Sequence, residues 1–255
     1  MPGLLAPSGA IGYPLTSMMS VPAPPAVPKR MSTSPVPITF SGPLDAAMPA
    51  GAHVQALLTP NQGYDCYVLA QWIEPGAAGL ALHTHAVDQY FYVVDGEMSI
   101  QLGSERFTAR SGAFIHVPPG IPHRSWNAGT EDERHIELIV PGPPLASLSS
   151  PAEARLASGA SEMFRTLGRG HPYKDARVDI HFDDWPAHEA RSIQAASRNL
   201  ILLVLAGTLT LGTDDSIETA RAHCLVPIKH GHVLPVCNPG PSSVSCLSIE
   251  LPMTS

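Results

Sequence analysis

The stretch GLALHTHAVDQYFYVVDG, from Gly79 to Gly96, decides both the fold and the chemistry that we expect of this chain. It contains two histidines separated by one residue, then a glutamine, then an apolar run that ends in glycine. Side chains along a β-strand point to alternate faces. One parity is shared by His83, His85, Gln89, Phe91 and Val93. Two imidazoles on one face can converge on a single metal ion, and imidazole suits most first-row transition metals.

A third metal ligand is expected from the segment GAFIHVPPGIPHRSWN, Gly112 to Asn127. Its prolines and glycine favour a tight turn that ends at His123. This histidine comes from a part of the chain well separated from the first two. The sequence therefore predicts three imidazoles, delivered by two segments, around one cation.

Short runs rich in β-branched and aromatic residues continue from about residue 53 to the C-terminus, separated by Gly, Pro and Asn. This spacing predicts an antiparallel sandwich or barrel. The runs occur as two copies, which predicts two equivalent β domains. The matching pairs are residues 93–103 with 202–212, 108–110 with 219–221, 117–123 with 226–232, and 127–129 with 238–240.

Four regions follow from these patterns: a Pro/Ala-rich extension over 1–37, a metal-binding domain over 38–146, a linker over 147–170 and a second domain over 171–255. The extension lacks hydrophobic periodicity, so we expect it to be disordered or to act as a strap. Within the linker, the segment from Ser150 to Gly168 starts with Ser150, Pro151 and, three residues after the serine, Glu153; this pattern is typical of a capping box and predicts a helix.

The two segments together resemble the cupin family. The first family motif is G-x5-HxH-x3,4-E-x6-G, and here Gln89 stands in the Glu position and Gly96 closes the motif, while Gly79 lies closer to His83 than the pattern asks. The second motif, G-x5-PxG-x2-H-x3-N, is matched by Gly112, Pro118, Gly120, His123 and Asn127. The resemblance implies an all-β, double-stranded β-helix (jelly-roll) bicupin with a short helical linker.

The resemblance also implies one divalent metal held by His83, His85, Gln89 and His123. Fe(II) is favoured, with Mn, Co, Ni, Cu or Zn as alternatives. Glutamine is a neutral oxygen donor, so the site would keep the full charge of the ion and suit an anionic ligand. The second copy has SIQAASRNL where the HxH strand should lie. We expect that degenerate domain to be metal-free and structural.

Three functions remain open for a site of this kind. An Fe(II)-type dioxygenase acting on a small phenolic, enolic or keto compound is favoured. The alternative is a Lewis-acid isomerase, cyclase or dehydratase of natural-product biosynthesis. The third is a metal-dependent cupin that binds a small molecule without catalysis.

Proton transfer would need a positioned acid or base, and the candidates are His116, His135 and Glu137. A dioxygenase would need an apolar pocket instead. The candidates to line it are Phe91, Val93, Met98 and Trp126.

The partner is expected to be a small molecule. The net charge of −7 gives no electrostatic footprint for nucleic acid, and no apolar run is long enough for a membrane span. The Pro/Ala-rich extension does not read as a signal peptide, because no positive segment precedes a continuous apolar one, and we expect a cytoplasmic protein. Cupins commonly form homodimers, although a bicupin can satisfy the same contact internally.

Overall fold

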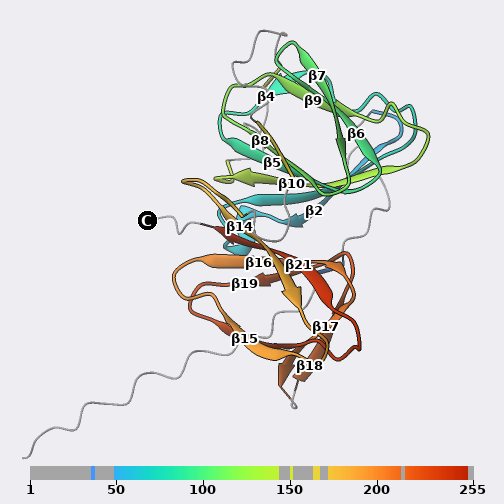
Figure 1. The fold of residues 1–255 in the computed structure, drawn as a ribbon. Coiled ribbons are helices and arrows are strands. Elements are labelled where there is room, and N and C mark those ends of the chain that lie inside the picture. The colour runs from blue at the N-terminus through green and yellow to red at the C-terminus, as the bar shows by residue number, and fades with distance from the viewer. Residues whose placement is uncertain are drawn as a thin grey trace, which may run out of the picture.

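Two β-barrels, one above the other in Figure 1, make up the described part of the chain. The computed structural model describes residues 36–37, 49–143, 150–151, 163–166, 172–213 and 216–251. Every strand pair in these ranges is antiparallel, which confirms the predicted all-β, jelly-roll bicupin. The one helical element assigned there is the 3-10 turn Pro60–Gln62.

The first barrel consists of a six-stranded sheet, ordered β12-β8-β5-β10-β3-β2, and a five-stranded sheet, ordered β11-β4-β9-β6-β7. Its strands are β2 (Ala52–Leu58), β3 (Tyr67–Ile73), β4 (His83–Thr84), β5 (Asp88–Asp95), β6 (Glu97–Leu102), β7 (Glu105–Arg110), β8 (Ala113–Val117), β9 (His123–Trp126), β10 (Glu133–Val140), β11 (Ser150–Pro151) and β12 (Phe164–Thr166). Apolar side chains fill part of its interior, among them Phe91, Val93, Met98 and Ile100.

The second barrel repeats this plan with sheets ordered β1-β19-β16-β21-β14-β13 and β15-β20-β17-β18. Its strands are β13 (Tyr173–Lys174), β14 (Asp179–Trp185), β15 (Ala190–Gln194), β16 (Asn199–Ala206), β17 (Thr208–Thr213), β18 (Ser216–Arg221), β19 (Cys224–Ile228), β20 (Val233–Cys237) and β21 (Val244–Leu251), joined by β1 (Val36–Pro37). The first strand of the chain thus pairs with β19 of the second barrel, at Leu225 and Cys224.

Two asparagines show that the internal repeat is structural. Asn127 donates its amide to the carbonyl of Ile73 at the end of β3 and accepts from the backbone of Gly129. Asn238 does the same with Trp185 at the end of β14 and with Gly240. In each barrel, the asparagine therefore connects the equivalent loop to the end of the equivalent strand.

The two barrels share a single apolar core, formed by the backs of their six-stranded sheets. Tyr90 and Tyr92 of β5 lie in it, together with Phe114 of β8 and residues of the second barrel such as Ile201 and Leu247. Because side chains alternate along β5, the residues between these tyrosines face the interior of the first barrel instead. The same strand serves the domain interface and the barrel interior.

The ends of the predicted linker helix are strands. Ser150–Pro151 pairs with β4, and Phe164–Thr166 pairs with β8. The unpaired backbone groups at both sheet edges offer hydrogen bonds that outweigh the local helix signal. Proline is tolerated at such an edge because its missing N–H can face away from the sheet. Residues 147–149, 152–162 and 167–170 of the predicted linker lie outside the described residues.

Most of the predicted extension, residues 1–35, also lies outside the described residues. Within the ranges listed above, no helix has the length and apolar character that crossing a bilayer requires.

Candidate metal centre

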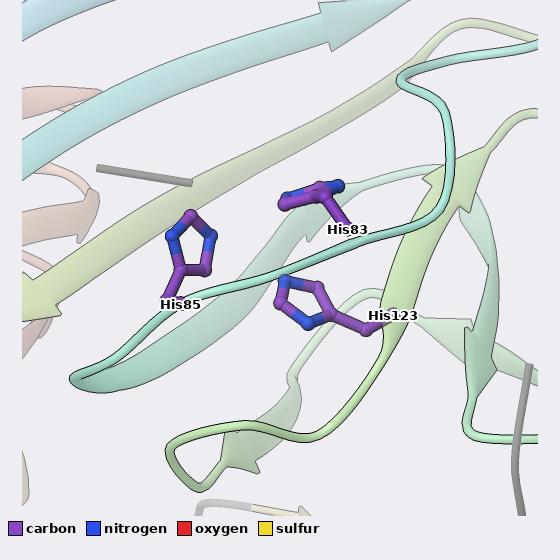
Figure 2. A group of neighbouring side chains, drawn as sticks. All are labelled: His83, His85 and His123. Atoms are coloured by element: carbon purple, nitrogen blue, oxygen red, sulfur yellow. The ribbon is translucent and has the colours of Figure 1, made fainter. Parts of the chain in front are cut away.

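Three histidines meet inside the first barrel, close to its mouth. His83 opens β4 and pairs directly with His123, which opens β9. His85 follows immediately after β4. Ring centroids lie 5.0 Å apart for His83 and His85, 4.5 Å for His83 and His123, and 5.1 Å for His85 and His123. Figure 2 shows the three rings turned toward a common centre, and one nitrogen from each lies within 4.8 Å of the others.

Backbone carbonyls fix which nitrogen each of two imidazoles presents. The Nδ1 of His83 lies 2.8 Å from the carbonyl oxygen of Ala81, and the Nδ1 of His123 lies 2.8 Å from that of Ile121. A carbonyl only accepts hydrogen bonds, so both Nδ1 atoms carry the proton and both Nε2 atoms keep a lone pair. The buried Nε2 of His123 has no hydrogen-bond partner among the described residues. A divalent metal fits this donor set.

Burial keeps these imidazoles neutral, as a metal ligand must be. Desolvation, with the neighbouring His83, lowers the pKa of His123 to about 3. Desolvation likewise lowers the pKa of His83, partly opposed by its bond to Ala81 and by the charge of Glu137. Protons therefore compete poorly for these two sites at neutral pH.

Two glycines allow the ligand segments to approach each other. Gly79 has φ of +64°, and a Cβ at this position would lie 1.9 Å from the carbonyl oxygen of Ser125 on β9. Gly120 donates its N–H to the carbonyl of His85 at 2.8 Å. The turn that delivers His123 thus also holds the backbone of His85, which explains why the two motifs occur together.

Gln89 lies on the interior face of β5, 1% exposed, and belongs to a chain of three polar side chains. Its Nε2 donates to one oxygen of the Glu137 carboxylate, and the Nε2 of Gln71 donates to the other. The Oε1 of Gln89 is buried without a partner among the described residues. Gln89 can therefore offer an oxygen to a metal while its nitrogen is engaged.

A second buried pair lies further along the same face of β10. The Nδ1 of His135 lies 2.8 Å from a carboxylate oxygen of Glu133, and both side chains are fully buried. Burial alone would lower the pKa of His135, but the charge and hydrogen bond of Glu133, with the charge of Glu137, raise it overall. The Nε2 of His135 has no partner among the described residues. In the imidazolium form of His135 this Nε2 carries a proton, and it lies inside the barrel.

Phe91 links the two groups of polar residues. Its ring lies 6.2 Å from that of His123 and 5.5 Å from that of His135, measured between centroids. Val93 and Met98 pack in the same interior cluster. Three of the four predicted pocket residues therefore line the barrel interior.

Trp126 and His116 lie elsewhere. On β9, His123 faces inward, so Trp126 at odd spacing faces outward, where the guanidinium carbons of Arg106 and Arg124 lie 5.8 and 5.1 Å from its ring centroid. His116 stacks on Tyr90 at the domain interface, with ring centroids 4.6 Å apart.

Two hydrogen bonds occupy both ring nitrogens of His116. Its Nε2 lies 2.8 Å from Asp88 and its Nδ1 lies 2.8 Å from the hydroxyl of Tyr173. The structure does not bring His116 or Trp126 to the three histidines.

Sequence reasoning missed Gln71 and Glu133. Each is a polar residue at an inward position of an apolar strand, in YVLAQWI and ERHIELIV. Such a position is a signal in itself, because a polar group inside a core needs a partner.

Comparisons with known proteins agree with this geometry. A family model described as a cupin domain matches residues 71–139. "Polyketide synthase CurC" from Streptomyces cyaneus is 28% identical over 109 residues, which are 41% of this chain and 71% of that protein. AerE from Microcystis aeruginosa has a similar structure, with a TM-score of 0.64 and 15% identity over 87% of this chain and 98% of that one.

Oxalate decarboxylase from Bacillus subtilis is similar in fold as well, with a TM-score of 0.60 and 12% identity, covering 89% of this chain and 80% of that one. The family match falls on the barrel that carries the three histidines, and the structural matches extend over both barrels. Residues 71–139 of the first barrel are therefore a cupin domain, and the chain has the two-barrel fold of a bicupin.

Proposed function

We propose that the first barrel is a metal-dependent enzyme site that transfers a proton on a small, anionic enolic, phenolic or keto substrate. The observation that carries this proposal is the buried Glu133–His135 pair, whose free Nε2 lies in the same interior as the three histidines. A divalent metal held by His83, His85 and His123, with Gln89 as a further oxygen donor, would supply a Lewis acid that polarises a carbonyl and favours an enolate.

The residues of the chain divide the remaining work. Neutral ligands leave the positive charge of the site intact, so an anionic oxygen is attracted to it. Phe91, Val93 and Met98 exclude water from the region between the ligands and His135. His135, with its raised pKa, donates a proton from Nε2, and Glu133 holds Nδ1 and stabilises the imidazolium form. The reaction class is isomerisation, cyclisation or dehydration.

A second candidate is an Fe(II)-dependent dioxygenase acting on the same kinds of substrate. The apolar wall of Phe91, Val93 and Met98 favours it, because each side chain is at most 3% exposed and the wall shields oxygen chemistry from water. In this case His135 would orient the substrate. Mn, Co, Ni, Cu and Zn also suit the donor set.

Two of the similar proteins support an oxygen-rich anionic substrate. The name of CurC points to polyketides, whose chains carry β-carbonyl groups that enolise readily. Oxalate decarboxylase is named for a small dianion. A homodimer, a cytoplasmic location and the lack of a nucleic-acid or membrane partner stay predictions.

One experiment separates the candidates. Protein is purified without added metal, its metal content is measured, and a panel of β-diketones, catechols and flavonols is tested in air and under argon. Turnover at equal rates in both atmospheres is expected for proton transfer. Turnover that stops under argon, with matching oxygen uptake, would establish the dioxygenase instead. A metal-containing protein that binds these compounds without converting any would support the non-catalytic alternative.

A further inference from the structure

Gln89 occupies a position where the cupin motif has a glutamate, and the structure holds a carboxylate directly behind it. Glu137 of β10 lies opposite Phe91 of β5. Phe91 is two residues after Gln89, so both face the interior of the barrel. Both amides that contact Glu137 come from neighbouring strands, Gln71 from β3 and Gln89 from β5. All three side chains are at least nine-tenths buried.

The hydrogen bonds among Gln71, Glu137 and Gln89 allow only one orientation of the Gln89 amide. A carboxylate accepts hydrogen bonds and donates none, so each glutamine must turn its NH2 group toward Glu137. The carbonyl oxygen of Gln89 then faces the opposite way, into the barrel, where it is buried without a partner among the described residues. Glu137 also acts electrostatically on His83, which places it near the histidine cluster.

We infer that Glu137 is a positioning residue, which with Gln71 fixes Gln89 so that its carbonyl oxygen, and not its NH2 group, faces the metal. This inference rests on the metal site of the proposed function. It assigns to Glu137 a role different from that of a proton-transfer group. It also explains the glutamine, because a glutamate at position 89 would place two carboxylates in contact inside the barrel.

The hydrogen-bonded series Gln71–Glu137–Gln89 also decides where the negative charge lies. The negative charge sits behind the ligand, on Glu137, and not on the ligand itself. The anionic group nearest the ion is then left to the substrate, which suits an enolate or phenolate better than a neutral compound. Exchanging the two side chains, with a glutamine at 137 and a glutamate at 89, would keep the number of hydrogen bonds but place the negative charge on the metal ligand.

That reversal provides the test. Full-length apoprotein is titrated with Co²⁺, and the affinity is measured by calorimetry and the ligand field by visible absorption. The variants are Glu137→Gln, Gln89→Glu and the double variant that carries both. Gln101→Glu is the matched control, because Gln101 is buried on the outer face of β6, where it contacts Gly103 and Arg124.

Each single variant should weaken Co²⁺ binding about 10- to 100-fold, the usual effect of losing an outer partner of a metal ligand. In Glu137→Gln the new amide offers one oxygen and one NH2 group to two glutamines, so the orientation of Gln89 is no longer fixed, and in Gln89→Glu two carboxylates repel each other. The double variant should recover most of the lost affinity, with an altered Co²⁺ spectrum because a carboxylate replaces the amide. Gln101→Glu should bind as the unaltered protein does.

Two results would overturn the inference while leaving the metal site intact: a Glu137→Gln variant that binds Co²⁺ as tightly as the unaltered protein, or a double variant that binds no better than the weaker single one. Thermal unfolding of each variant separates loss of metal binding from loss of fold. Failure of the unaltered protein to bind Co²⁺ would instead refute the metal site and the proposed function with it.

Discussion

The two barrels share one fold but place different side chains at equivalent interior positions. The strand registers place Val93 opposite His135 in the first barrel and Val204 opposite Cys246 in the second. With this alignment, Gln89, Glu133 and His135 of the first interior have apolar or weakly polar counterparts, Glu137 has the smaller polar Ser248, and Phe91 has Leu202. The pairs are Gln89 and Leu200, Phe91 and Leu202, Glu133 and Val244, His135 and Cys246, and Glu137 and Ser248.

This comparison teaches what the site demands of the fold. In the second barrel, residues such as Leu202, Val204 and Cys246 join a continuous apolar core. In the first, buried charges and imidazoles occupy the equivalent space, which is unfavourable unless each polar group finds a partner. The first barrel therefore combines an apolar cluster with partnered polar groups, whereas an apolar cluster fills the equivalent part of the second. Four predictions test this division of roles.

The largest effect is expected from the third histidine. His123→Ala removes a metal ligand from the first barrel, and metal affinity should fall by more than the roughly 10- to 100-fold loss typical of an outer partner. Metal analysis of the purified variant measures this. His232→Ala, the equivalent change in the second barrel, should leave the metal content unchanged. Equal metal content in the two variants would contradict the assignment.

The next effect concerns proton transfer at the corresponding positions of β10 and β21. His135→Gln should lower turnover by about 10²- to 10⁴-fold, the usual contribution of a positioned acid or base. Metal content should stay the same. Cys246→Ala, at the matching position of the second barrel, should leave turnover unchanged. An active His135→Gln variant would remove the main support for proton transfer.

A packing change in the second barrel should affect stability alone. Leu202 is fully buried, so Leu202→Ala should lower the free energy of unfolding by about 2–5 kcal/mol. Denaturant unfolding measures that change, and Co²⁺ titration should show an unaltered metal site. Weakened metal binding in this variant would mean that the second interior contributes more to the site than packing.

The last effect is a pH dependence that arises at His123 in the first barrel. The pKa of His123 is about 3 in the folded chain and 6.5 ordinarily. Between these values the unfolded chain binds the extra proton, so the apoprotein should lose stability as the pH falls through this window, by about 1.4 kcal/mol per pH unit. Denaturant unfolding from pH 7 to 4 checks this, and His123→Gln should flatten the slope. A slope unchanged by that substitution would place the titration elsewhere.

Sequence alone could predict the barrel and the histidine cluster, because the two motifs specify local spacing. His83 and His85 lie on one short segment, and the turn before His123 is dictated by proline and glycine. The internal repeat could also be predicted, since Gly96 and Gly207 both adopt positive φ at the same turn.

The rest depends on contacts between strands distant in sequence. Gln71 and Glu133 belong to no motif, and only the register of β3, β10 and β5 shows which residues they meet. His116 could not be excluded from the candidate site by sequence alone, because only the structure shows that its side of β8 faces the interface between the two barrels. Trp126 could have been excluded, because alternation counted from His123 points it outward. The two ends of the predicted linker helix are strands, because edge hydrogen bonds outweigh a local capping signal, and its middle lies outside the described residues.

The alternation along β5 has one more consequence, for any attempt to divide the protein. Gln89 and Phe91 face the interior of the first barrel, while Tyr90 and Tyr92 are buried in the core that it shares with the second barrel. If the two barrels were expressed as separate proteins, each would expose to water the apolar face that it buries against the other. We expect neither half to remain in solution when expressed alone, because each would expose its side of the core that the two barrels share.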